Sequence, residues 1–209
     1  MPAAVTSPTA VALLQRAAIG FYGKIPARGD FVRAGLPRSF MDPWDDWMQR
    51  VLAASREQLG EAWSPAWLEA PVWRFALMPG LCGPAAVIGL WLPSVDRAGR
   101  YFPLTLTAVA AAVDLPELIE QAGGFLAAAE AAGRDALADD LAPETLATRL
   151  AAATAVPDAA PGTEPPEGPA SGWWWTAGAP RVRAAAFACD ALPDAARFAA
   201  MLDDGAAAP

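Results

Sequence analysis

Three apolar segments in the middle of the chain restrict its fold most strongly. Residues 72–78, 85–92 and 102–112 each have the length and the β-branched or aromatic content of a strand. Turns that contain proline and glycine separate them, and these connections are too short for the crossover helices that parallel strands need. We therefore expect three neighbouring antiparallel strands at the centre of the fold.

The segment after residue 42 has the clearest helical pattern. Asp42 can cap a helix and Pro43 suits its first turn. Apolar side chains, among them Trp44 and Trp47, then recur at helical spacing until about Leu59. Further helices are expected from residue 114, from residue 143 and near the end of the chain, and further strands at 17–23, 173–176 and 182–189.

A chain of 209 residues fits one domain. The expected fold class is α/β, with a central, mainly antiparallel sheet flanked by helices on its faces in a single domain. The composition predicts a flexible leader at residues 1–16 and a folded domain at 17–204. Within that domain, residues 157–172 are rich in proline and glycine, and we expect a mobile loop there.

The charge and apolar content exclude several classes of partner. The net charge of −8 argues against nucleic acid, because neutralising phosphates needs a basic surface. No uninterrupted apolar run approaches the roughly 20 residues of a spanning helix, so we expect no membrane insertion. No export signal is visible, and Cys82 and Cys189 are too few for a secreted fold stapled by disulfides. These features predict a cytoplasmic protein with reduced, buried thiols.

Residues for known types of catalysis are scarce. The chain has no histidine, which removes Ser-His-Asp and Cys-His catalysis and the usual zinc sites. Residues 20–24 lack the frame of a phosphate-binding P-loop. The adjacent aspartates at 45–46, 139–140 and 203–204 each fit a solvated helix face or end. We predict no catalytic residue, no metal site and no cofactor.

Two charged loops are the candidate site. In the first, at residues 24–33, a carboxylate lies beside aromatic and branched residues, and in the second, at 93–103, charges alternate between two apolar strands. The charges either tie the loops together and satisfy backbone groups, which we favour, or form a binding surface directly. The candidate residues are Lys24, Asp30, Ser94, Asp96, Arg97 and Arg100.

We also predict one ion pair between these loops. Asp30 should pair with Arg97 or Arg100, because an isolated charge in an apolar loop would be costly. A further hypothesis is a hydrolase that uses Asp30 and Asp96 around a pocket. Convergence of the two carboxylates with an unpaired, perturbed group would favour that hypothesis, and pairing of the carboxylates with arginines would contradict it.

The tryptophans give a second set of candidates. Trp44, Trp47, Trp73 and Trp91 follow helix or strand periodicity and should lie in the core. The run at 173–175 cannot point inward throughout, since neighbouring strand residues alternate between faces. At least one of these rings should be exposed or lie against another helix, and an exposed tryptophan suits a protein interface. Trp174 and Trp175 are therefore candidate structural or interface residues.

Several of these blocks together resemble the TagF (ImpM) family of bacterial type VI secretion proteins. The resemblance extends over roughly residues 19–202 and also includes the final helix after Leu192 and Pro193. The alanine-rich helices, the acidic Pro/Gly-rich loop and the leader depart from the family pattern. The matching blocks, in chain order, are GFYGKIP at 20–26 with GDFV at 29–32, LP at 36–37, Phe40, Trp44, Asp45, Trp47, WRF at 73–75, PSVDRAGRYFPL at 93–104 and Trp174 with Trp175.

The resemblance implies an accessory protein that regulates type VI secretion negatively and after translation. Its partners would be type VI secretion proteins, in some relatives the scaffold protein with a forkhead-associated domain. Because the residues themselves offer no catalytic group or cofactor motif, we expect a non-enzymatic protein. A structural or assembly component of the apparatus and the hydrolase described above remain as alternatives.

Overall fold

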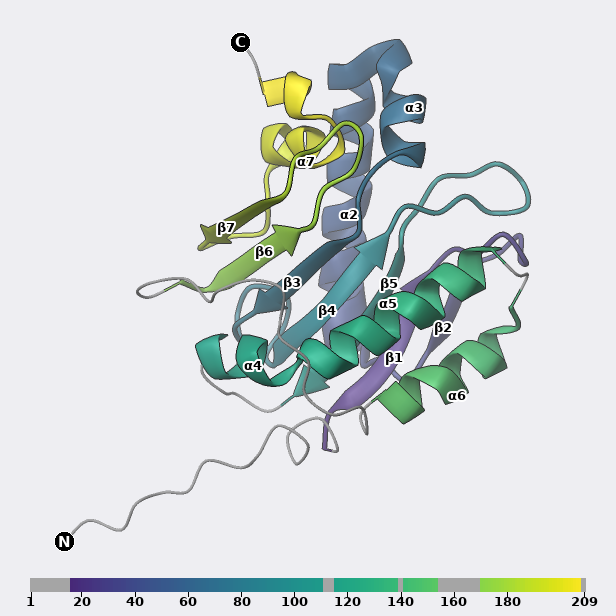
Figure 1. Ribbon diagram of the computed structural model, residues 1–209, viewed down its shortest axis with the longest axis vertical. Helices are drawn as coiled ribbons and strands as arrows, with labels where there is room; N and C mark the ends of the chain where they lie inside the picture. Colours follow the sequence, from purple (N-terminus) through teal and green to yellow (C-terminus); the bar gives the residue numbers. More distant parts are fainter. Residues whose placement is uncertain (1–15, 111–114, 139–140, 154–169, 208–209) are drawn as a thin grey trace, which may run out of the picture.

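The computed structural model describes residues 16–110, 115–138, 141–153 and 170–207. Within these residues the chain forms a seven-stranded sheet with strand order β2-β1-β5-β4-β3-β6-β7, and every neighbouring pair is antiparallel. The predicted α/β fold with a mainly antiparallel sheet is therefore confirmed (Figure 1). The strands are β1 (Ala18–Gly23), β2 (Val32–Ala34), β3 (Trp73–Leu77), β4 (Ala86–Leu92), β5 (Leu104–Ala110), β6 (Gly172–Thr176) and β7 (Ala185–Cys189).

Helices cover both faces of this sheet. Figure 1 shows α5 in front of the central strands, α6 near β1 and β2, and α2 behind the sheet. Each face carries its own apolar core, and every residue of β4 and β5 is buried because both sides of these strands are covered. One face packs on α2 (Arg38–Leu59), α3 (Trp63–Leu68) and α7 (Ala195–Leu202), and the other on α4 (Leu115–Gln121), α5 (Gly123–Ala138) and α6 (Pro143–Ala153). Two short 3-10 helices, η1 (Gly60–Ala62) and η2 (Asp204–Ala207), follow α2 and α7.

Aromatic rings fill the core under α2. The ring centroids of Trp44 and Phe75 are 4.7 Å apart, and those of Trp44 and Trp174 are 6.2 Å apart. The Trp44 indole donates to the Thr105 hydroxyl at 3.1 Å, which satisfies a polar group that would otherwise be costly to bury. The four tryptophans predicted to lie in the core, Trp44, Trp47, Trp73 and Trp91, are all buried.

The long helix begins earlier than its sequence predicts. It starts at Arg38 instead of Asp42, with Pro37 at its N-cap, and Pro43 lies inside it. The amides of Phe40 and Met41 both donate to the Pro37 carbonyl, at 3.1 Å each. Burial of Phe40 and Met41 on the sheet extends the helix toward its start, so tertiary packing overrides the boundary that capping preferences favour.

A short strand, β2, overlaps the end of the charged loop expected at residues 24–33. β2 has three residues and pairs with β1, opposing Phe21 with Ala34. Residue 20 must be a glycine for this pairing, because a Cβ on Gly20 would lie 1.8 Å from the Ala34 carbonyl oxygen. The charged loop expected at residues 24–33 thus ends in a strand, which extends to Ala34 and is too short to show a strand pattern of its own.

The other boundaries agree with prediction to within a few residues. The last strand begins at Ala185 instead of residue 182. The leader predicted for residues 1–16, except Arg16, and the predicted mobile loop up to residue 169 lie outside the described residues. The final three residues of that predicted loop are described, and Gly172 already belongs to β6.

Candidate functional site

The two charged loops meet through a tight turn that begins at Asp96. The Asp96 amide donates to the Arg100 carbonyl at 3.0 Å, and the Gly99 amide donates to the Asp96 carbonyl at 2.9 Å. Gly99 has φ +77°, a conformation that glycine adopts at low cost. Inside the turn, the amides of Ala98 and Arg100 donate to Asp96 Oδ1 at 2.8 and 2.9 Å. The backbone of this loop therefore directs the Asp96 carboxylate inward.

Lys24, at the end of β1, supplies the cation that faces this carboxylate. Its ammonium forms a hydrogen-bonded ion pair with Asp96 Oδ2, and the two side chains are 5% and 0% exposed. Burying either charge alone would cost several kcal/mol, so each makes the burial of the other tolerable. We call the buried pair and Arg100 the Lys24–Asp96–Arg100 clamp.

Arginines join the clamp to the first loop. Arg100 Nε donates to Asp96 Oδ2 at 2.7 Å, and its Nη2 donates to the Gly29 carbonyl. Arg97 Nη2 donates to the Ala27 carbonyl at 3.1 Å. Asp96, Arg97 and Arg100 therefore tie the two loops together.

The electrostatic surroundings keep Asp96 ionised. Burial alone raises the pKa of its carboxyl, but hydrogen bonds from Lys24, from Arg100 and from two backbone amides outweigh burial. The pKa of Asp96 consequently lies well below its usual range. At neutral pH the clamp contains two cations and one anion.

The predicted pairing of Asp30 with Arg97 or Arg100 is wrong. Asp30 is exposed, and within the described residues its carboxylate forms no ion pair. Arg100 binds Asp96 instead, four residues away in the same loop. The sequence places both carboxylates in apolar surroundings, but only the Asp96 turn folds its side chain toward Lys24.

An aromatic residue that sequence reasoning did not select marks the surface of this site. Phe31 is 44% exposed although it packs on Tyr22 and Phe102, with ring centroids 5.4 and 4.8 Å away. The Lys24 ammonium lies 4.7 Å from the centroid of the Phe31 ring, within reach of a cation–π interaction. The sequence feature that could have identified Phe31 is a large apolar residue next to Gly29 and Asp30 in a charged loop.

Tyr22 anchors the cluster of Tyr22, Phe31 and Phe102 to α2. Its hydroxyl donates to Asp45 Oδ1 on α2 at 2.6 Å. Burial, and then the hydrogen bond and negative charge of Asp45, raise the pKa of Tyr22 well above its usual value. The phenol stays protonated at neutral pH, and its hydrogen bond to α2 fixes the Tyr22 ring against which Phe31 packs.

The remaining candidates, Ser94, Trp174 and Trp175, are buried in the protein. Ser94 is buried, and its hydroxyl has no hydrogen-bond partner within the described residues, while its carbonyl accepts from the Trp67 indole at 3.1 Å. Trp174 and Trp175 are 0% and 2% exposed, so neither ring is exposed at the surface, and the alternative that rings of this run lie against helices holds for both. They point to opposite faces, and helices cover both faces, which lets adjacent strand residues be buried together.

The hydrolase hypothesis does not fit this geometry. Asp96 accepts four hydrogen bonds, two of them from cations, and Asp30 lies at the surface. A catalytic carboxylate pair would need free oxygen atoms that converge on one cavity. The ion pair with Arg100 is the observation that contradicts this hypothesis.

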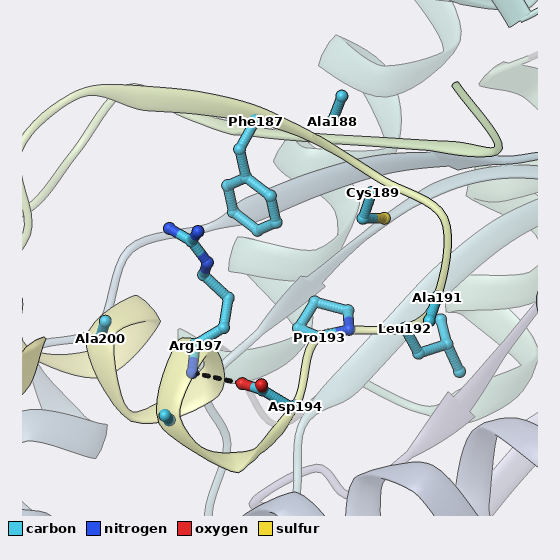
Figure 2. Close-up of a pocket in the computed structure, with 10 residues that line it drawn as sticks. Phe187, Ala188, Cys189, Ala191, Leu192, Pro193, Asp194, Arg197 and Ala200 are labelled. Atoms are coloured by element: carbon cyan, nitrogen blue, oxygen red, sulfur yellow. Dashed lines mark hydrogen bonds between the residues drawn. The ribbon is translucent and has the colours of Figure 1, made fainter. Parts of the chain in front are cut away.

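A separate groove lies between β7 and α7, with a volume of about 600 Å³ (Figure 2). Asp194 accepts a hydrogen bond from the Arg197 amide at 2.8 Å and so caps α7. The Arg197 guanidinium lies 4.9 Å from the centroid of the Phe187 ring.

Burial raises the pKa of both thiols, that of Cys189 and that of Cys82, the latter to about 12. Neither thiol is an activated nucleophile at neutral pH.

The sequence that forms this fold and clamp matches a class of proteins associated with type VI secretion. A family model described as the TagF N-terminal domain, type VI secretion system-associated, matches residues 20–153, which include both charged loops. The chain therefore belongs to the TagF family. Its fold is similar to the crystal structure of PA0076 from Pseudomonas aeruginosa PAO1, with a TM-score of 0.77 and 34% identity over 89% of this chain and 94% of that one. No curated protein matches the chain.

Within the described residues no helix combines the length and the apolar content that a bilayer requires.

Proposed function

We propose that this chain is a non-enzymatic, cytoplasmic accessory protein that restrains type VI secretion after translation. It acts by binding another component of the system, the scaffold with a forkhead-associated domain. Membership of the TagF family supports the association with type VI secretion. The observation that carries the binding mechanism is the exposed Phe31 ring, held by the buried clamp.

A fixed aromatic side chain suits a protein interface. Phe31 contacts Tyr22, Phe102 and Lys24, so its conformation is largely set before any partner arrives. A preorganised side chain loses little conformational entropy on binding. Aromatic and arginine residues are also enriched where interfaces derive most of their binding energy.

The charges around Phe31 define the kind of surface that the partner meets. Four exposed arginines on the two loops, Arg28, Arg33, Arg97 and Arg100, outnumber the one exposed carboxylate there, Asp30, although the whole chain has a net charge of −8. A locally basic surface on an acidic protein directs an acidic partner to one face. The clamp holds these loops together, which gives it a structural role in the interface and no catalytic one.

A binding assay with purified proteins tests the proposal. The scaffold should bind the wild-type chain, and Phe31→Ala should weaken binding at least tenfold, or about 1.4 kcal/mol. Leu68→Ala is the matched control, because Leu68 is another large exposed apolar residue, at 60%. Thermal unfolding of each variant separates loss of the interface from loss of the fold.

Three results would contradict parts of the proposal. Failure of the wild-type chain to bind would exclude the scaffold as the partner. Equal binding by Phe31→Ala and wild type would remove Phe31 from the interface. Stoichiometric copurification with the assembled apparatus, in place of the free scaffold, would support a structural or assembly role.

A further inference from the structure

A pocket lies directly beside the clamp, between the end of α2, the start of α3 and the Asp96 turn. Its volume is about 500 Å³, and it is lined by Arg56, Trp63, Gly99, Arg100 and Tyr101. Two guanidinium groups and two aromatic rings therefore meet in one hollow. Neither the family description nor the likeness to PA0076 assigns a role to these residues.

The aromatic wall of the pocket is fixed by contacts within the protein. The Trp63 indole donates to the Ser55 hydroxyl at 2.8 Å, and the hydroxyls of Tyr101 and Ser64 are hydrogen-bonded at 2.8 Å. The two rings pack edge to face with centroids 5.0 Å apart. Because their polar atoms have partners, the rings supply a rigid surface, and the arginines supply the unused polar groups.

Arg56 lies over the aromatic wall of the pocket. Its guanidinium carbon lies 4.3 Å from the centroid of the Trp63 ring and 5.7 Å from that of Tyr101. Within the described residues Arg56 takes part in no ion pair. Stacking on the rings orients the plane of the guanidinium and leaves its N–H groups available to a ligand.

Arg100 contributes a second cation, and its carboxylate partner, Asp96, is shared with Lys24. The clamp therefore keeps a surplus positive charge. Its side chain is 57% exposed, and Nη1 makes no hydrogen bond within the described residues. The pocket therefore presents two guanidinium groups whose charge exceeds what the surrounding carboxylates neutralise.

We propose that this pocket binds a carboxylate side chain from an acidic segment of the partner protein. Planar guanidinium groups pair with carboxylates through two parallel hydrogen bonds, and the aromatic wall contacts the methylene groups of a glutamate. The overall charge of −8 repels acidic chains elsewhere, so attraction at this hollow also gives specificity. The inference rests on the proposed function, since it names the chemistry of the same partner.

The first experiment uses a defined probe and needs no secretion protein. Acetylated hexaglutamate is titrated into the full ¹⁵N-labelled chain while the Nε–H signals of Arg56 and Arg100 and the indole signal of Trp63 are followed. These signals should shift together and saturate, and the affinity should fall as salt is added. Inorganic phosphate is titrated in parallel, because it has a similar negative charge without the peptide.

Variants on one helix make the test specific. Arg56→Gln should weaken hexaglutamate binding at least tenfold, and Arg56→Lys should fall between it and the wild type because the charge remains but the planar fork is lost. Arg50→Gln is the matched control, since Arg50 is an exposed arginine on α2 outside the pocket and its loss changes the net charge equally. It should bind hexaglutamate like the wild type.

Each other outcome overturns the inference. Equal binding by wild type and Arg56→Gln, or equal weakening by Arg50→Gln and Arg56→Gln, would show that the pocket is not the site. Saturation by phosphate without binding of hexaglutamate would show an anion site unsuited to an acidic segment.

A second experiment separates this inference from the proposed function. Arg56→Gln should weaken binding to the purified scaffold, whereas Arg50→Gln should not. If hexaglutamate binds in the pocket but Arg56→Gln binds the scaffold normally, the pocket does not serve this partner. The interface at Phe31 would still stand in that case, because it is tested by its own variant.

Discussion

At the scale of single residues, the buried carboxylate of Asp96 determines how the two loops are joined. It accepts from Lys24, from Arg100 and from the amides of Ala98 and Arg100. No other residue type offers two acceptor atoms at this position without lengthening the side chain. The clamp is therefore expected to control the stability of the site and the position of Phe31.

Replacing Asp96 with asparagine should destabilise the protein. The amide would place an NH₂ group or an uncharged oxygen against the buried Lys24 ammonium, which then lacks its counter-charge. We expect a loss of about 3 kcal/mol in the free energy of unfolding, at the low end for a broken buried pair because Arg100 lies at the surface. Urea denaturation measures it.

Asp30 provides the control for this substitution. It is an exposed aspartate in the partner loop, and Asp30→Asn should change the free energy of unfolding by less than about 0.5 kcal/mol. Equal stability of Asp96→Asn and Asp30→Asn would show that the clamp contributes nothing to the fold.

The depressed pKa of Asp96 predicts a dependence of stability on acid. In the unfolded chain an aspartate binds its proton near pH 3.9, whereas the folded protein keeps Asp96 ionised to lower pH. The unfolded state thus binds more protons below about pH 4, and the stabilisation present above that pH is lost as pH falls. The free energy of unfolding of wild type minus that of Asp96→Asn should shrink below pH 4. A constant difference from pH 7 to pH 2 would contradict this explanation.

The sequence predicts most members of the site but not their pairing. Lys24, Asp96, Arg97 and Arg100 stand out because charges interrupt apolar loops. Which carboxylate turns inward depends on the backbone hydrogen bonds of the Asp96 turn, which no local pattern reveals. The sequence leaves open whether Trp174 and Trp175 are exposed or lie against helices for a related reason, since their burial requires both faces of the sheet to be covered.

At the scale of secondary structure elements, α2 connects the core to the candidate site. Trp44 and Trp47 lie in the aromatic core, while Asp45 holds Tyr22 and Arg56 lines the pocket at the far end. One face of the helix thus packs on the sheet while its flanks position the interface. A shift of this helix would therefore move both the Phe31 ring and the pocket.

Truncation of Trp44 should loosen this connection. Trp44 is fully buried against Phe75 and Trp174, so Trp44→Ala should cost about 3–5 kcal/mol in the free energy of unfolding. Trp44→Phe keeps an aromatic ring but leaves the Thr105 hydroxyl without its indole donor, and a smaller loss of about 1–2 kcal/mol is expected. Thermal or urea unfolding distinguishes the two. Equal losses would mean that ring packing contributes little at this position.

Long elements are predictable from the sequence, and short ones depend on their neighbours. The pattern finds the central strands because they are continuous apolar segments, and the helix from Pro143 because it buries a periodic set of side chains. β2 exists through its pairing with β1, and the start of α2 through the burial of Phe40. Such features come from tertiary contacts that connect residues far apart in the sequence.

At the scale of the whole molecule, the covered sheet and the clamp give one rigid unit with its candidate interface at one end. The Trp67 indole binds the Ser94 carbonyl, and the Ser64 hydroxyl binds that of Tyr101, so α3 is fixed to the second loop. Little rearrangement is then expected when a partner binds. The proposed function is occupancy of a partner, so the effect of the protein should follow its amount relative to that partner.

The dose dependence of secretion tests this account most directly. The gene is deleted and restored at graded expression, and the secreted tube protein is measured together with the cellular amounts of this chain and of the scaffold. Binding by mass action predicts that secretion rises on deletion, falls gradually with dose and is silenced only when the chain approaches the abundance of the scaffold. Phe31→Ala, expressed at equal amounts, should shift this curve to higher dose. Secretion unaffected by deletion and by overproduction would contradict the regulatory role, and silencing at a small fraction of the scaffold's abundance would contradict occupancy.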